Sequence, residues 1–146
     1  MLLINNKYII FYLLFGKNIS KTFILFLFIQ SVLAQNDPNP VRFLNNPIGD
    51  LATIDLFASW DKKNKSLDNS IVFVGSSSIR KWQTSKSFPE LPVINRGFGG
   101  SHLSDVNYFL NETVLKYQPK VVVLYAGDND ILYGKSPSIV LEDFIE

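Results

Sequence analysis

The sequence predicts an α/β fold with a parallel sheet, and two observations support this. Three runs, Ile71–Val74, Pro92–Asn95 and Val121–Tyr125, have the length and the apolar, β-branched composition of strands. A segment with helical spacing or a helix-start signal follows each run. Strands and helices that alternate in this way build parallel βαβ units, so we expect helices layered against one sheet.

Composition limits the classes of protein to which the chain can belong. Its 146 residues allow one domain. The absence of cysteine excludes disulfides, thiolate metal ligands and a cysteine nucleophile. The net charge is +1 and no segment carries a basic stripe, which argues against nucleic acid as a partner.

Residues 1–34 have the composition of an export signal. The apolar runs Tyr8–Phe15 and Phe23–Ala34 are both shorter than the ~18 residues that indicate a membrane span. The second run follows lysines and ends in Val32-Leu33-Ala34, which fits a signal-peptide cleavage site. We therefore predict cleavage after Ala34 and a secreted or periplasmic protein. The alternative is an uncleaved leader that anchors the protein, and membrane contact is expected only through this leader.

Residues 35–69 are predicted to form an N-terminal extension with one helix. Gln35–Asp50 is rich in asparagine and proline and is interpreted as irregular. Ile54–Lys63 places Ile54, Leu56, Phe57 and Trp60 close to one helical face.

The domain from residue 70 to residue 146 holds the sheet. Ile71–Val74 is continuously apolar and ends at Gly75, which is typical of a strand buried on both faces, and a short helix is expected over Ser78–Trp82. His102–Leu115 has apolar residues at spacings of three and four, which predicts one helix capped by Ser101 or Ser104.

The last two elements are a strand and a helix. Val121–Tyr125 is predicted as a third buried strand, and Ser136-Pro137-Ser138 has the hydroxyl cap and early proline of a helix start. That helix runs to Glu146 with Glu142 and Asp143 in its last turns and no glycine or asparagine cap. Because acids are unfavourable at a helix C-terminus, we expect the fold to be incomplete at the C-terminus.

Three polar blocks each follow a predicted strand directly. They are Gly75-Ser76-Ser77-Ser78, Asn95-Arg96-Gly97-Phe98-Gly99-Gly100 and Gly127-Asp128-Asn129-Asp130. Ligands bind at the carboxyl ends of parallel strands, so the blocks are expected at one edge of the sheet. A serine hydroxyl, a glycine N–H and a carboxamide are the parts of a serine nucleophile and its oxyanion hole.

Each block alone has an alternative interpretation. The serines could simply cap a helix, and their spacing does not choose among Ser76, Ser77 and Ser78. A dinucleotide-binding loop is excluded because His102 stands where the last glycine of that pattern is required. Asp128 and Asp130 could be metal ligands, but no third ligand accompanies them, so neither a metal nor another cofactor is expected.

Taken together, the blocks resemble those of the SGNH/GDSL hydrolase superfamily (GDSL-like lipases and acylhydrolases). These are serine esterases with a three-layer, flavodoxin-like parallel sheet, and the match runs from about Ile71 to the end of the chain. The resemblance implies that Ser77 is the nucleophile and that its N–H, the Gly100 N–H and the Asn129 side chain form the oxyanion hole. Ser76 replaces the aspartate that usually precedes the nucleophile.

The family's final block, Asp-x-x-His, has no match in this chain. His102 is the only histidine. It is expected near Gly100, where it could contact substrate or cap the following helix. The resemblance implies a serine esterase acting on small acyl or acetylated carbohydrate esters, whose catalytic His and Asp lie outside these residues. The alternative is a non-catalytic remnant or a carbohydrate-binding module of the same fold.

Overall fold

The computed structural model describes residues 3–5, 8–10, 37–44, 54–64 and 67–146. The chain divides into two compact units, Met1–Ala34 and Gln35–Glu146. In the first unit, β1 (Leu3–Asn5) pairs antiparallel with β2 (Tyr8–Ile10). The predicted signal-peptide core and cleavage site lie outside the described residues. Within the described part, no helix has both the length and the apolar character needed to cross a membrane.

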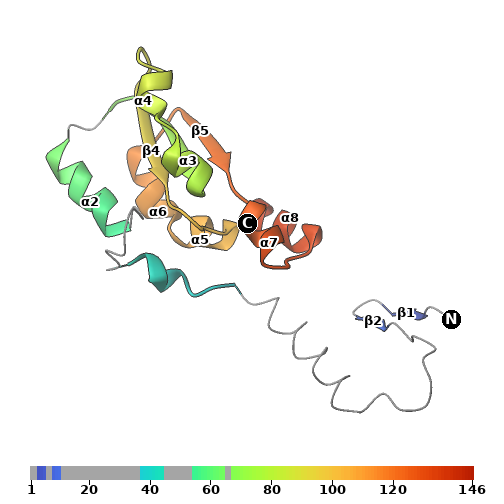
Figure 1. Ribbon diagram of the computed structural model, residues 1–146. Coiled ribbons are helices and arrows are strands. Elements are labelled where there is room, and N and C mark those ends of the chain that lie inside the picture. The colour runs from blue at the N-terminus through green and yellow to red at the C-terminus, as the bar shows by residue number, and fades with distance from the viewer. Residues whose placement is uncertain (1–2, 6–7, 11–36, 45–53, 65–66) are drawn as a thin grey trace. The chain divides into compact units, whose positions relative to one another are not determined.

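The second unit is built on a parallel sheet, as the sequence predicts. Its strands are β3 (Ile71–Gly75), β4 (Val93–Gly97) and β5 (Val121–Tyr125), in the order β4-β3-β5 (Figure 1). Gly75 is in register with Gly97 on one side and with Tyr125 on the other. The carboxyl ends of all three strands therefore meet at one edge.

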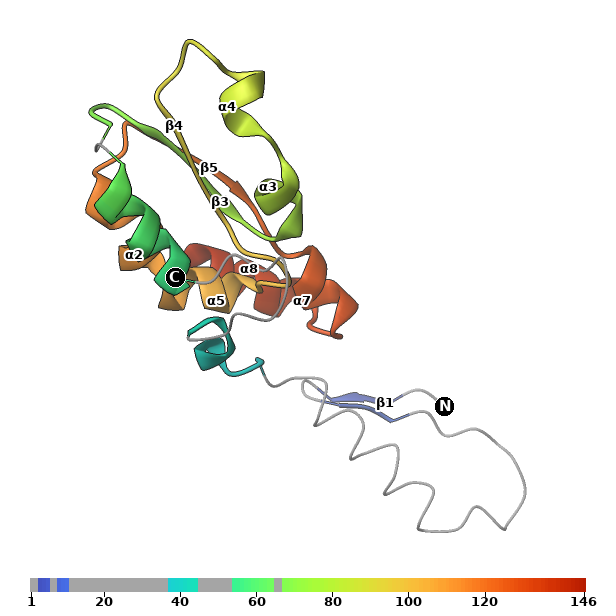
Figure 2. The ribbon, with the colours of Figure 1, turned by 60° about the vertical axis from the view of Figure 1, so that its left-hand side comes forward.

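Helices lie on both sides of this sheet, which makes the unit an α/β structure (Figure 2). One side carries α3 (Ser77–Lys81) and α4 (Thr84–Ser87), and the other carries α2 (Ile54–Lys63), α5 (Leu103–Tyr108) and α6 (Leu110–Thr113). The remaining elements are the short 3-10 helices η1 (Pro40–Phe43) and η2 (Leu115–Tyr117), and the helices α7 (Asp128–Leu132) and α8 (Pro137–Ile145).

The core lies between the central strand and the helices. Val72 and Val74 of β3 are buried in it. The buried rings of Phe43, Phe98 and Phe109 meet edge to face, with centroid distances of 4.9 to 6.4 Å. Phe43 comes from η1, so part of the segment predicted to be irregular is ordered by burying an aromatic side chain.

The helix predicted over residues 102–115 is broken into α5, α6 and η2, so that prediction was wrong. The backbone leaves helical geometry at Phe109 (φ −101°, ψ 21°) and at Val114 (φ −131°, ψ −65°). Both side chains are buried in the core. Tertiary packing of these two residues therefore overrides the local helical spacing.

The predicted caps of that helix also differ from the structure. His102, rather than Ser101 or Ser104, is the cap residue of α5. The carboxylate of Asp105 accepts a hydrogen bond from the His102 N–H at 2.8 Å. At α8 the prediction is confirmed, since the Ser136 hydroxyl accepts a bond from the Ile139 N–H at 3.4 Å and Pro137 opens the helix.

The strand Val121–Tyr125 forms as predicted but is not buried. Val122 is 46% exposed, whereas Val72, in the central strand, is 0% exposed. β5 pairs only with β3 among the described strands, so it is an edge of the sheet. The apolar composition indicated a strand, but burial depends on neighbours that the composition does not specify.

Replacing Gly75 with alanine should destabilise the fold by about 3 kcal/mol. Gly75 has φ +133°, and a Cβ there would overlap the carbonyl oxygen of Tyr125. Gly100→Ala is the matched control, because Gly100 also has positive φ but faces open space, and it should cost only about 1 kcal/mol. Chemical denaturation measures both, and equal losses would contradict the close approach of β3 and β5.

Candidate functional site

The three serines after β3 have different environments. Ser76 is buried, and its hydroxyl donates to Asp128 Oδ1 at 3.2 Å. Ser77 is half-buried and is the first residue of α3, whereas Ser78 is exposed. Ser76 is thus occupied in linking the first polar block to the third. Ser77 is the serine that combines a position at the strand–helix turn with partial access to solvent.

The second block is held in place by Asn95. Its amide nitrogen donates to the carbonyls of Ile79 and Trp82 at 2.8 and 3.0 Å, and its amide oxygen accepts from the Gly97 N–H at 2.9 Å. A Cβ at Gly97 would overlap the backbone nitrogen of Arg80. Asn95 and Gly97 therefore fasten β4 to α3, which fixes the start of the glycine turn.

Gly100, the predicted oxyanion donor in this block, has a different setting. It is exposed, with φ +80°, and no atom lies within 4 Å of the position that a Cβ would take. A residue with a side chain is strained in this conformation. A side chain at position 100 would therefore meet no steric clash but would strain the backbone. The oxyanion role of Gly100 stays a prediction.

The third block opens α7 and contacts the residues that directly follow the second block. The amide of Asn129 donates to the Ser101 carbonyl at 2.9 Å. Both carboxylate oxygens of buried Asp130 accept from the Leu103 N–H, at 3.3 and 3.1 Å. These bonds, together with the Ser76–Asp128 bond, connect the three blocks at the carboxyl edge of the sheet.

A buried lysine, which the sequence analysis did not single out, lies beside this edge. Lys135 is 4% exposed, and its ammonium contacts Asp143 Oδ2 at 2.6 Å, Asp130 Oδ1 at 3.1 Å and the Asp37 carboxylate. Burial alone would lower the pKa of Lys135, but its bonds to these three carboxylates outweigh burial and raise it. Nothing in the local sequence marks a single lysine in a turn as the centre of such a cluster.

The same cluster fastens the segment of residues 37–44 to the domain. Burial raises the pKa of Asp37, but the hydrogen bond and charge of Lys135 outweigh it and hold that pKa below its usual range. The ion pair between Asp37 and Lys135 anchors one end of this segment. At the other end, Arg42 of η1 pairs with the buried carboxylate of Asp105 in α5. Residues 37–44 are therefore held by charge to α5 and to the turn that follows α7, as well as by the burial of Phe43.

His102 lies inside the cluster rather than in an open site. It is 1% exposed, and its ring lies against that of Tyr133 with centroids 5.1 Å apart. Its Nδ1 is 3.5 Å from Asp37 Oδ1 and 3.6 Å from Asp130 Oδ1, and neither ring nitrogen has a hydrogen-bond partner among the described residues. The predicted contact between His102 and a substrate stays a prediction.

Asp37, His102 and Asp130 are the set of described side chains that could together hold a metal ion. Their ligand atoms lie within 4.8 Å of one another. The ammonium of Lys135, however, contacts the same oxygens of Asp37 and Asp130. Lys135 therefore already supplies the positive charge that a metal would bring. We call Lys135 and its three carboxylate partners, Asp37, Asp130 and Asp143, the ion-pair latch.

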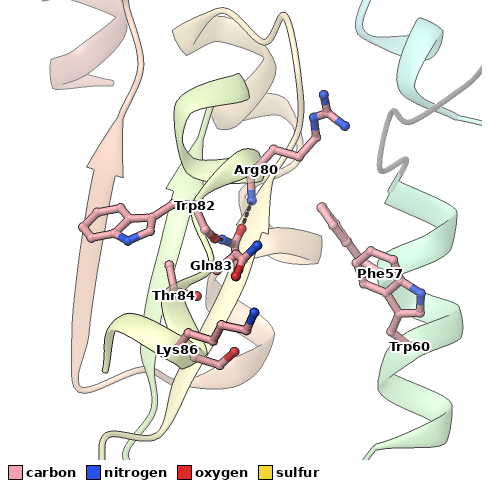
Figure 3. Close-up of a pocket in the computed structure, with 10 residues that line it drawn as sticks. Phe57, Trp60, Arg80, Trp82, Gln83, Thr84 and Lys86 are labelled. Carbon is pink, nitrogen blue, oxygen red and sulfur yellow. Dashed lines mark hydrogen bonds between the residues drawn. The ribbon is translucent and has the colours of Figure 1, made fainter. Parts of the chain in front are cut away.

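Two hollows, of 320 and 640 Å³, lie between α2, α4 and β4. In the smaller one, Phe57 and Trp60 of α2 face Arg80 and Gln83 across the gap, while the Trp82 ring points away (Figure 3). None of Ser77, Gly100 and Asn129 lines either hollow. The predicted catalytic edge is thus separate from these hollows.

No protein-family model matches the chain, and no curated protein matches it. What the chain does therefore has to be inferred from its own residues.

Replacing Lys135 with methionine should destabilise the protein by about 3 kcal/mol, because it removes the positive charge beside the buried carboxylate of Asp130 and those of Asp37 and Asp143. Lys86→Met is the control, since Lys86 is exposed and should contribute less than about 0.5 kcal/mol. Urea denaturation at neutral pH measures both variants. Equal stability of the Lys135→Met and Lys86→Met variants would show that the ion pairs of Lys135 do not stabilise the fold.

The contribution of Lys135 should also depend on pH. Asp37 has a lowered pKa in the fold, so its stabilisation is present above its unfolded pKa of about 3.9 and is lost as pH falls through the folded value. The raised pKa of Lys135 keeps its charge throughout this range. The stability difference between the wild type and Lys135→Met should therefore shrink below pH ~4. A constant difference from neutral to acidic pH would show that the carboxylates do not titrate against Lys135.

Proposed function

We propose that this chain carries the nucleophile and oxyanion hole of a serine ester hydrolase of the SGNH/GDSL type. The observation that carries the proposal is the placement of Ser77. It is half-buried and begins a helix at the carboxyl end of the central strand, while its buried neighbour Ser76 bonds to Asp128. The blocks that hold Gly100 and Asn129 are connected at the same edge.

In this proposal Ser77 Oγ attacks the ester carbonyl carbon and gives its proton to a base. The Ser77 N–H, the Gly100 N–H and the amide of Asn129 donate to the developing oxyanion. The Asn129 amide has two hydrogens, and one remains for this role when the other bonds to Ser101. Each donor is expected to contribute ~10²–10³ to the rate. The alcohol then leaves, and water releases the acyl group from Ser77.

The described residues place no histidine free to act as the base for Ser77. His102 is the only histidine of the chain, and it is buried against Asp37 and Asp130. We propose that the base is a His–Asp pair outside these residues, as in the Asp-x-x-His block of the family. Without that pair a serine hydroxyl is a poor nucleophile, and turnover is expected to be ~10⁴–10⁶ lower.

The proposed substrates are small acyl esters or acetylated carbohydrates. The flavodoxin-like SGNH fold is part of the same proposal, and the parallel sheet with helices on both sides is compatible with it. The proposed location is outside the cytoplasm, with the leader removed after Ala34. A protein that retains the leader would instead act at a membrane surface.

A non-catalytic carbohydrate-binding protein is the second candidate. The observation in its favour is His102, whose burial in the ion-pair latch leaves Ser77 without an imidazole from the described residues. This candidate and the enzyme differ in one measurable property, which is the intrinsic reactivity of Ser77. Only the enzyme needs a serine that accepts a tetrahedral acyl or phosphonyl group.

In a protein that includes the proposed His–Asp pair, incubation with a fluorophosphonate should label Ser77, and the Ser77→Ala variant should lose the label. Ser78→Ala is the matched control, since Ser78 is the exposed neighbour in the same turn and should label as the wild type does. Intact-mass and peptide mass spectrometry locate the adduct, and melting curves confirm that the variants fold. A label that persists in Ser77→Ala, or no label on folded wild type that includes the pair, would contradict the enzyme and favour the binding protein.

A further inference from the structure

The two hollows beside β4 adjoin, and we call them together the β4 trough. Their volumes of 320 and 640 Å³ are those of sites for small molecules. The residues that line both hollows are Trp60 of α2, Thr84 and Ser85 of α4, and Asn95 of β4. None of the predicted catalytic residues lines the trough, so its chemistry can be considered by itself.

The walls of the β4 trough are fixed by a network around Asp61. The Tyr117 hydroxyl donates to Asp61 Oδ2 at 2.7 Å, and Arg96 Nε donates to the Tyr117 hydroxyl at 2.6 Å. Arg96 and Lys116 both form ion pairs with the Asp61 carboxylate. This network ties α2 to β4 and η2, so the walls are held in place without a ligand. A preformed site of this kind loses less conformational entropy on binding.

The β4 trough is rich in positive charge. The charged residues among the described side chains that line it are Arg80, Lys86, Arg96, Lys116 and Asp61. By contrast, residues 35–146 as a whole hold 11 basic and 13 acidic residues. Asp61 cannot neutralise both Arg96 and Lys116, and Lys86 is exposed. The trough therefore keeps an excess of positive charge and suits an anionic ligand.

The lining of the β4 trough also combines an aromatic wall with polar side chains. Trp60 is 40% exposed, and its ring lies against that of buried Phe57 with centroids 5.6 Å apart. Both rings face Gln83 across the gap (Figure 3). Exposed Gln83, Ser85 and Asn64 bring amide and hydroxyl groups. A sugar ring matches this lining, because its C–H face packs on an indole while its hydroxyls bond to amides and hydroxyls.

We propose that the β4 trough binds an acidic oligosaccharide, with one sugar ring stacked on Trp60 and sugar carboxylates paired with Lys86 and Lys116. A chain of sugars fits better than a single sugar, because the two hollows adjoin along β4 and share Trp60. A nucleic acid fits less well, because the acidic excess of residues 35–146 repels a chain with a charge on every unit. This inference does not rest on the proposed enzymatic function.

The first test applies the full chain to an array of acidic oligosaccharides, each beside the same oligosaccharide with its carboxyl groups reduced to alcohols. The wild type should bind at least one acidic oligosaccharide. It should bind the reduced counterpart at least ~10-fold more weakly, because reduction removes the ion pairs with lysine. Ser77→Ala should bind as the wild type does, which separates this result from the reactivity of Ser77. A single-stranded oligonucleotide on the same array is the competing polyanion.

The second test measures the affinity of variants for the tightest-binding acidic oligosaccharide by titration calorimetry. Lys86→Glu should weaken binding at least ~10-fold, because it replaces an attractive charge with a repulsive one. Lys81→Glu is the matched control, since Lys81 is an exposed lysine of α3 that does not line the trough, and it should bind as the wild type does. Trp60→Ala should also weaken binding ~10-fold, whereas Trp60→Phe keeps a ring and should retain most of the affinity.

Circular dichroism checks that each variant folds, and the two lysine variants change only exposed side chains. The proposal is overturned if the wild type binds no acidic oligosaccharide, or binds the reduced counterparts equally well. Equal affinities of Lys86→Glu and Lys81→Glu would place the binding outside the trough and overturn it as well. Tighter binding of the oligonucleotide than of every acidic oligosaccharide would indicate a nucleic-acid site instead.

Discussion

The close approach of β3 and β5 at Gly75 determines where the other parts of the candidate site lie. No side chain fits between Gly75 and the Tyr125 carbonyl, and the next residue, Ser76, donates its N–H to that carbonyl at 3.0 Å. The two chain segments therefore leave the sheet side by side. Ser76 then reaches Asp128, and Ser77 begins α3 at the same edge. A bulkier residue at this point would separate the serine turn from the block that carries the carboxamide.

Electrostatics stabilises the surroundings of that edge. Lys135 pairs with the carboxylates of Asp37, Asp130 and Asp143. Asp130 lies in α7 and Asp143 lies in α8, whereas Asp37 precedes η1. Asp130 in turn fixes the backbone of Leu103 at the start of α5. The glycine turn before α5 is therefore positioned from both sides, by Asn95 at its start and by this latch at its end. The same arrangement uses the only histidine of the chain as a buried structural group.

The sequence predicts the parts of this fold that depend on local composition, and misses those that depend on distant partners. Short runs rich in apolar and β-branched residues located all three strands, and Ser136 located the start of α8. The helix over residues 102–115 was predicted as continuous, because spacing alone cannot show that Phe109 and Val114 are drawn into the core. Burial of β5 and the Lys135 latch depend on which segments become neighbours. The three polar blocks were found from the sequence, and the choice of Ser77 among the serines came from the family resemblance. The structure adds that Ser76 is buried and bonded to Asp128.

The most direct test of the account is a crystal structure of the protein, including the proposed His–Asp pair, after reaction with a fluorophosphonate. The phosphonyl oxygen mimics the oxyanion of the tetrahedral intermediate. The account predicts an adduct on Ser77 whose oxygen lies about 2.7–3.1 Å from the Ser77 N–H nitrogen, the Gly100 N–H nitrogen and the Asn129 amide. An adduct on Ser77 whose oxygen points into solvent, with Gly100 and Asn129 out of reach, would contradict the claim that these three blocks form one oxyanion hole.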